Sequence, residues 1–263
     1  MRRDVTSSLT LDAEGPARLV LAIAVADGLA AEETLAITQD GVPLEVAELS
    51  DAHGTRLHEV DVTAGRVEVR YSARVEGRGE PAPVDELDDV RYRRPSRYCE
   101  SDTLAAVAAA EFAGLGMDDL LPAVSSWVGT QLAYDGSSTD PTGGAVATLL
   151  SRRGVCRDFA HLVVALLRAL GVPARVVAVY APGLEPMDFH AVAEALVEGR
   201  WLVVDATTLA PRASLVRIAT GRDAADTAFL TTIGEAVRMV RMEVTATADA
   251  LPDEDVRTPV ALG

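Results

Sequence analysis

Cys156 stands at the start of an apolar segment, residues 156–170, where a cysteine can serve as a nucleophile. The thiolate is the reactive form of cysteine, and the free N–H groups and dipole at a helix N-terminus stabilise it. The same N–H groups can receive the oxyanion of a tetrahedral intermediate, and Gly154 lets the backbone turn closely before them. Arg157 adds positive charge, whereas Asp158 is expected to serve the helix start. The alternative is that Cys156 is one more small buried apolar residue.

His190 and Asp205 lie on two consecutive predicted strands joined by a two-residue turn, Glu198-Gly199. This turn places Asp205 opposite Val192, and side chains two residues apart share one face of a strand. His190 and Asp205 are therefore diagonal neighbours on one face, where the carboxylate can orient the imidazole. If the helix N-terminus packs against this hairpin, Cys156, His190 and Asp205 supply the nucleophile, general base and orienter of thiol acyl transfer.

Several further residues carry groups that invite a functional interpretation. Tyr134 and Trp127 precede the cysteine and are candidates for a side-chain donor to the oxyanion, although both can equally be core residues. His161 lies five positions after Cys156, on a different helix face, and is expected to be a hydrogen-bonded structural residue. Cys99 has no base nearby in the sequence and is expected to be structural.

The two remaining histidines, His53 and His58, lie near Asp51 and Glu59 in the first part of the chain. Their spacing matches no metal-binding pattern, so they are expected to be surface residues. The sequence therefore predicts no metal site, and the proposed thiol chemistry requires no cofactor.

The elements that must position these residues fall into two parts. Residues 1–75 form short segments enriched in β-branched residues and separated by turn signals, which predicts an antiparallel, β-sandwich-like module. Residues 76–100 are rich in Gly, Pro and charge, as in an ordered linker. Residues 101–247 are predicted to form a second, α+β domain, and residues 248–263 a flexible, solvated tail.

Within the second domain, helical signals come first and strand signals follow. The segment 156–170 is apolar on nearly every side and ends at Gly171 and Pro173, which predicts a buried central helix. Other helices are expected from about residue 103, from residues 118–119 and from 143–144 to 150, and strands over 174–180, 190–197, 201–207 and 237–247.

The charge balance excludes several classes of partner and chemistry. The 263 residues carry a net charge of −16, which opposes binding to nucleic acid or to an anionic membrane surface. All 24 basic residues are arginine, so Schiff-base lysines and the phosphate-binding lysine of a P-loop are absent. Without an apolar leader segment, the chain is expected to be cytoplasmic, and its two cysteines free thiols.

These motifs resemble the bacterial transglutaminase-like superfamily of papain-type thiol enzymes. The resemblance is carried by Ser151–Leu162 around the cysteine, Arg168–Arg175, Asp188–Glu194 around the histidine, and Asp205–Thr207. It extends through Pro95–Asp102 and Gly221–Asp226, and the module at residues 1–75 is similar to the N-terminal domain that accompanies these proteins.

The resemblance implies that residues 101–247 are the catalytic domain of a cysteine protease-like enzyme, with Cys156 as nucleophile, His190 as base and Asp205 as orienter. Two positions depart from the family pattern. The family often has Trp two residues after the histidine and Pro after the aspartate, where this chain has Val192 and Ala206. The walls of the substrate cleft are therefore expected to differ.

The predicted function is attack by Cys156 on an amide of a peptide or protein substrate, through a thioester, with hydrolysis favoured over transfer to an amine. The triad alone does not separate these two outcomes. One alternative is a catalytically idle binding or scaffolding domain. Another is an arylamine acetyltransferase, whose helical N-terminal architecture fits poorly with the predicted β module.

Overall fold

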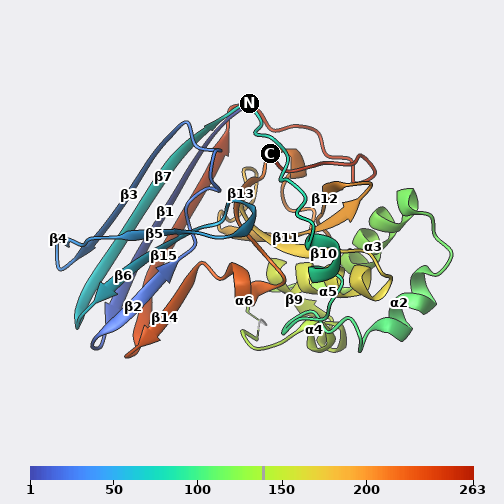
Figure 1. The fold of residues 1–263 in the computed structure, drawn as a ribbon, viewed down its shortest axis with the longest axis horizontal. Helices are drawn as coiled ribbons and strands as arrows, with labels where there is room; N and C mark the ends of the chain where they lie inside the picture. Colours follow the sequence, from blue (N-terminus) through green and yellow to red (C-terminus); the bar gives the residue numbers. More distant parts are fainter. Residues whose placement is uncertain (138–139) are drawn as a thin grey trace.

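Two β-sheets pack face to face in the first part of the molecule, and helices gather around a third sheet in the second part (Figure 1). The computed structural model describes residues 1–137 and 140–263. Its sheets are almost entirely antiparallel, and the α+β class predicted from the sequence is confirmed. Among the described residues, no helix has the length and apolar character needed to cross a membrane.

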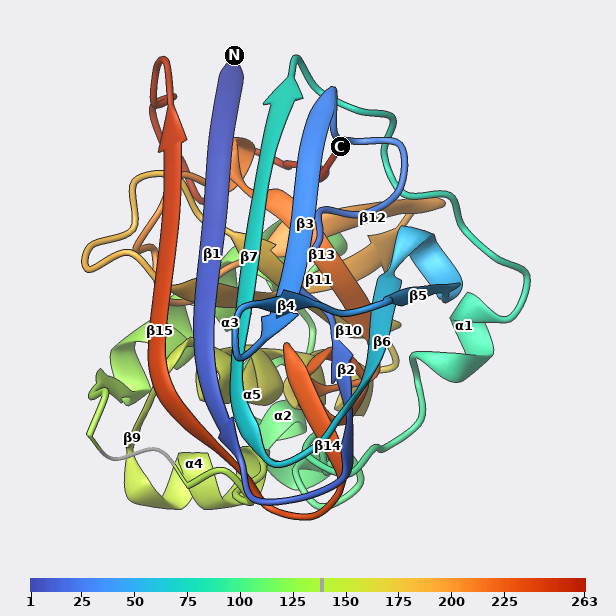
Figure 2. The ribbon, with the colours of Figure 1, turned by 90° about the vertical axis from the view of Figure 1, so that its left-hand side faces the viewer.

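The larger sheet of the first part has the strand order β15-β1-β7-β3-β4, and its long strands lie side by side in Figure 2. Buried and more exposed side chains alternate along β1, as expected for a strand with one face on a core. The strands of this sheet are β1 (Arg2–Ala13), β3 (Glu32–Gln39), β4 (Val42–Pro43), β7 (Gly65–Glu76) and β15 (Val237–Ala248).

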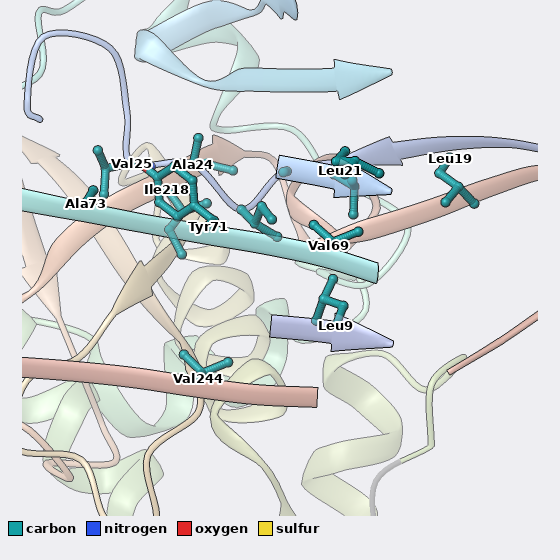
Figure 3. Close-up of a cluster of buried hydrophobic side chains, with 14 of the residues drawn as sticks. Leu9, Leu19, Leu21, Ala24, Val25, Val69, Tyr71, Ala73, Ile218 and Val244 are labelled. Carbon is teal, nitrogen blue, oxygen red and sulfur yellow. The ribbon is translucent and has the colours of Figure 1, made fainter. Parts of the chain in front are cut away.

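The smaller sheet has the order β14-β2-β6-β5 and covers the inner face of the larger one. Its strands are β2 (Ala17–Leu21), β5 (Ala47–Ser50), β6 (Arg56–Val62) and β14 (Leu230–Gly234). Side chains of both sheets, among them Leu9, Leu21, Val69 and Val244, form one buried cluster (Figure 3). We call the two sheets together the β module.

The strand predicted at 237–247 was expected to belong to the α+β domain at residues 101–247. It pairs instead with a strand of the β module, which corrects that expectation. β15 pairs with β1, with Val5 opposite Ala246, and β14 pairs with β2. The chain thus returns to the β module after its helices. Alternating apolar residues identify a strand, but its partner is decided by contacts more than 200 residues apart.

The second part, the α+β module, is built on a sheet of order β12-β11-β10-β13. The central helix α5 (Cys156–Ala169) packs on one face of it, against Val176, Ala193 and Val204. The strands are β10 (Ala174–Tyr180), β11 (Phe189–Val197), β12 (Arg200–Val204) and β13 (Val216–Gly221). Other elements are α1 (Asp88–Arg91), α2 (Ala105–Phe112), α3 (Met117–Gln131), α4 (Ala145–Ser151), α6 (Ala224–Thr227), and the short parallel pair β8 (Ala133–Tyr134) and β9 (Arg153–Gly154).

The side chains of His53 and His58 are buried, which corrects the prediction that they lie on the surface. His53 sits in a short 3-10 turn (Ala52–Gly54), and its Nε2 lies 3.2 Å from Oδ1 of the buried Asp88. His58 contacts Glu48 at 3.0 Å. The sequence neighbours Asp51 and Glu59 suggested a surface position, but the carboxylates that contact these imidazoles in the fold are Asp88 and Glu48.

The C-terminal segment packs on the α+β module rather than forming a wholly solvated tail. The Val203 N–H donates to the carbonyl of Val260, and Leu262 is buried. The buried Arg212 donates to the carboxylate of Glu254 at 2.6 Å. The polar composition of this segment led to the wrong expectation. Arg212 also donates to the carbonyls of Asp255 and Thr258, so hydrogen bonds, an ion pair and Leu262 together dock the segment.

Candidate active site

Cys156 is the first residue of α5, and the local sequence explains why the helix begins there. The N–H of Val155 donates to the carboxylate of Asp158 at 3.0 Å, which closes the first turn. A Cβ on Gly154 would lie 2.6 Å from the Cβ of Asp158, so a side chain there would displace the capping residue. Arg157 also donates to Asp158. Asp158 thus serves the helix start, as the sequence predicts.

His190 and Asp205 meet on the hairpin of β11 and β12, and both side chains are buried. The turn residues Glu198 and Gly199 have positive φ values of 49° and 73°, as a two-residue hairpin turn requires. Ala193 pairs with Val204, and this register brings His190 Nε2 to 3.2 Å from Asp205 Oδ2. The diagonal contact predicted from the strand register is present.

Asp205 is held from two sides. Its Oδ1 accepts the N–H of Thr207 at 2.8 Å and the Thr207 hydroxyl at 2.7 Å. Its backbone carbonyl accepts the hydroxyl of Ser125, on α3, at 3.0 Å. Neither hydroxyl was predicted to contact Asp205, although an Asp followed two residues later by Thr is a recognisable turn signal.

The charges at this pair favour a protonated imidazole next to a carboxylate. Burial works against the charged ring, but the Asp205 carboxylate and the Cys156 sulfur outweigh it and raise the pKa of His190 to about 10. Burial likewise opposes ionisation of Asp205, yet His190 and Thr207 lower the pKa of its carboxyl. The pair therefore carries an imidazolium and a carboxylate at neutral pH.

The other ring nitrogen of His190 is available to the thiol. With Nε2 used by Asp205, the buried Nδ1 has no hydrogen-bond partner among residues 1–137 and 140–263. Cys156 and His190 line one cavity of about 400 Å³, and Asp205 lies behind the imidazole. The three side chains are thus arranged in the order sulfur, imidazole, carboxylate.

The two aromatic candidates for an oxyanion donor are placed differently. Tyr134, on β8, interacts with both the backbone N–H and the sulfur of Cys156, and burial together with the sulfur raises the pKa of its phenol to about 12. Trp127 does not line the cavity of Cys156 and His190. It packs on Phe112 and the core around α5, and its indole N–H donates to Glu111 at 3.0 Å, which fits the alternative that Trp127 is a core residue.

His161 and Cys99 lie away from the reacting groups. The Nε2 of His161 accepts the N–H of Ala224, and its ring stacks on Tyr98. Burial lowers the pKa of His161 to about 4, so the ring is neutral at pH 7. Cys99 is fully buried, and burial raises the pKa of its thiol far above the usual range.

Comparison with known proteins agrees with this geometry. Residues 90–206 match the family model of the transglutaminase-like superfamily, and this range includes Cys156, His190 and Asp205. An uncharacterised protein of Mycobacterium leprae is 32% identical over 120 residues, which covers 45% of this chain and 41% of that protein. The chain thus spans less than half the length of this curated relative.

Among solved structures, a proposed cysteine protease from Cytophaga hutchinsonii is 34% identical and has a TM-score of 0.86. The alignment covers 98% of this chain and 93% of that one, so the similarity includes the β module. The periplasmic domain of TgpA from Pseudomonas aeruginosa aligns at 22% identity over 75% of this chain and 91% of that one, with a TM-score of 0.41. The chain belongs to the transglutaminase-like superfamily.

Proposed function

We propose that this protein is a thiol-dependent acyl-transfer enzyme that opens amide or peptide bonds through a thioester on Cys156. The observation that carries the proposal is the buried His190–Asp205 pair, whose free ring nitrogen shares a cavity with Cys156 at the N-terminus of α5. A nucleophile and an oriented base on one cavity are the central requirements of thiol acyl transfer.

In the proposed reaction, the Cys156 sulfur attacks the substrate carbonyl carbon and a C–S bond forms. The C–N bond then breaks, and the amine leaves with the proton of the His190 imidazolium. Water attacks the thioester carbon and gives a proton to His190, the C–S bond breaks, and the acid is released with the thiolate restored. Asp205 keeps the imidazole oriented throughout and stabilises its positive charge.

Water is the preferred acceptor in this proposal, and one observation supports it. The Cytophaga hutchinsonii relative, itself a proposed cysteine protease, aligns over nearly the whole chain. The chain contains no lysine and only two glutamines, Gln39 and Gln131, so it cannot crosslink to itself by ordinary glutamine-to-lysine bonds except at the α-amino terminus, and the acceptor has to be tested with added amines. A cytoplasmic location stays a prediction.

Labelling and trapping test the nucleophile. We expect iodoacetamide near neutral pH to modify Cys156 much faster than the buried Cys99, as mapped by mass spectrometry. We also expect acyl adducts on Cys156 after incubation with a mixed peptide pool, and none on Cys156→Ser, with Cys99→Ser as the matched control. Equal labelling of both thiols, or labelled Cys156 without any adduct or product, would favour an idle binding domain.

A second experiment separates the two acceptors. An acyl donor is incubated with and without a millimolar small diamine, and acid and amide products are followed by mass spectrometry. We expect the acid to dominate in both samples. Dominant amide exchange would overturn the hydrolase assignment and show that the strongly acidic chain recruits cationic amines instead.

A further inference from the structure

The cavity at Cys156 and His190 is walled mainly by apolar side chains. Its floor comes from the sheet of the α+β module, where Val176, Ala178 and Ala191 face the space. Ala178 pairs directly with Ala191 across the strands, so two small side chains meet at one point of the sheet. A pair of larger residues at this point would occupy part of the volume, and the alanines leave it open.

One wall of the cavity is aromatic. Phe229 lies between α6 and β14, and its ring stacks on Phe189, with the ring centroids 5.2 Å apart. Phe189 also contacts the fully buried Tyr180, at 5.5 Å. The packed row of rings gives this wall a defined position beside the reacting groups.

The β module supplies a further part of the wall, next to Phe229. Leu230 opens β14, Met242 lies on β15, and Ala22 follows β2, and all three line the cavity. Because the chain returns to the β module after β13, apolar side chains of the β module reach the cavity that holds Cys156 and His190.

The cationic groups at the cavity already have carboxylate partners, which disfavours an acidic ligand. The imidazolium of His190 is paired with Asp205 at 3.2 Å, and the guanidinium of Arg157 with Asp158 at 2.8 Å. The carboxyl that lines the cavity, Asp188, accepts the N–H of Phe189. A volume of about 400 Å³ with these walls suits a residue-sized apolar group and disfavours a negatively charged one.

We infer that this cavity is a specificity subsite, shared by the two modules, that binds a large aliphatic or aromatic side chain next to the scissile amide of a peptide. The inference rests on the proposed function. It names the substrate class as peptides with a bulky apolar residue beside the bond that is cleaved, and it gives the β module a role in selecting them.

Alkylation rates test the subsite without requiring turnover. Cys156 is labelled with iodoacetamide, N-benzyl iodoacetamide and a carboxylated benzyl analogue, and each rate is divided by the rate with glutathione. We expect the benzyl probe to gain about tenfold over iodoacetamide and the carboxylated probe to lose that gain. Labelling of Cys156 with equal normalised rates for all three probes would overturn the inference while leaving the nucleophile in place. Absence of labelling at Cys156 would instead count against the proposed function.

Two matched pairs of variants show which residues cause the faster labelling of Cys156 by the benzyl probe. Met242 and Val240 are both exposed apolar residues of β15, 36% and 42% exposed, but only Met242 lines the cavity. Met242→Glu is expected to remove most of the benzyl advantage, and Val240→Glu to retain it. Ala228→Leu, at the cavity wall, is expected to reduce the advantage relative to Ala225→Leu on the exposed side of α6. Equal effects within both pairs would show that the apolar preference arises elsewhere.

Peptide substrates complete the test. Peptides that differ only in the residue next to the scissile bond are compared by kcat/KM, with Phe, Gly, Gln and Glu in turn. We expect Phe to exceed Gly by about tenfold or more, and Met242→Glu to narrow that ratio. A preference for Gln or Glu over Phe would overturn the inference.

Discussion

At the scale of single residues, the candidate triad depends on hydrogen bonds that a substitution can alter one at a time. Asp205 Oδ1 accepts from Thr207, whereas Asp205 Oδ2 contacts His190 Nε2, so the two oxygens bind different partners. Because only Oδ2 contacts the imidazole, a substitution can remove the orientation of His190 and keep the contact with Thr207.

We predict that Asp205→Asn folds but loses activity by about 10²- to 10⁴-fold. The amide oxygen can still accept from Thr207, whereas its NH₂ would face His190 Nε2, which must then act as an acceptor. The imidazolium is lost and the proton moves to the nitrogen that faces Cys156. The measurement is kcat/KM with circular dichroism as the check on folding, and Asp61→Asn on the exposed face of β6 is the control. Near wild-type activity in a folded Asp205→Asn protein would contradict the orienting role.

At the scale of elements, α5 does more than present Cys156, because its buried side chains join it to neighbouring segments. His161, one and a half turns into the helix, accepts the N–H of Ala224 at the start of α6. It can do so only while Nε2 is unprotonated. Burial keeps it so, since it lowers the pKa of His161 to about 4 from an ordinary value of 6.5.

We predict that His161 lowers the free energy of unfolding of the protein in acid. Between pH 6.5 and about 4 the unfolded chain binds a proton at this histidine and the folded chain does not, so stability falls as the pH falls. The loss amounts to at most about 3 kcal/mol. His161→Gln, whose amide oxygen can still accept from Ala224, should lose less stability over this range. Urea unfolding at pH 7 and pH 4.5 measures the difference, and parallel losses in the two proteins would refute the assignment. His53 and His58 are present in both proteins, so their contributions to the pH dependence of stability cancel in the comparison.

At the scale of the whole molecule, the two modules are joined by a shared apolar core and by a buried polar cluster. Ile218 of the α+β module lies in the same core as the sheets of the β module (Figure 3), and Tyr180 belongs to that core as well. Beside this core, Arg175 donates to Glu194 at 2.8 Å and to His53 at 3.1 Å. The guanidinium of Arg175 thus links a sheet residue of one module to a turn of the other.

We predict that Glu194→Gln destabilises the protein by about 3–5 kcal/mol, because it leaves Arg175 and Arg217 buried without their counter-charge. Both arginines lower the pKa of Glu194 to about 2 despite its complete burial, so it is charged at neutral pH. The free energy of unfolding in urea is the readout. Asp226→Asn, which breaks the exposed pair with Arg222, is the matched control and should change stability little. Equal effects at the two positions would show that the cluster does not contribute as proposed.

Local sequence determined the elements that carry the candidate site. The apolar run ending at Gly171 specifies α5, and the Glu198-Gly199 turn specifies the register that joins His190 to Asp205. Both signals lie within a few residues of the features they predict, which is why the pattern of apolar residues and turn geometry suffice. The family assignment is confirmed on the same residues, whereas the catalytic roles stay predictions.

Tertiary structure alone decided which distant segments meet. The return of β15 to β1, the burial of the His53 side chain and the contact of Trp127 with Glu111 depend on partners between 16 and more than 200 residues away. Periodicity shows which face of a segment is apolar, but it does not identify the surface that covers that face. Such pairings are chosen by the burial of apolar area and the satisfaction of polar groups across the whole chain, and no single segment carries that information.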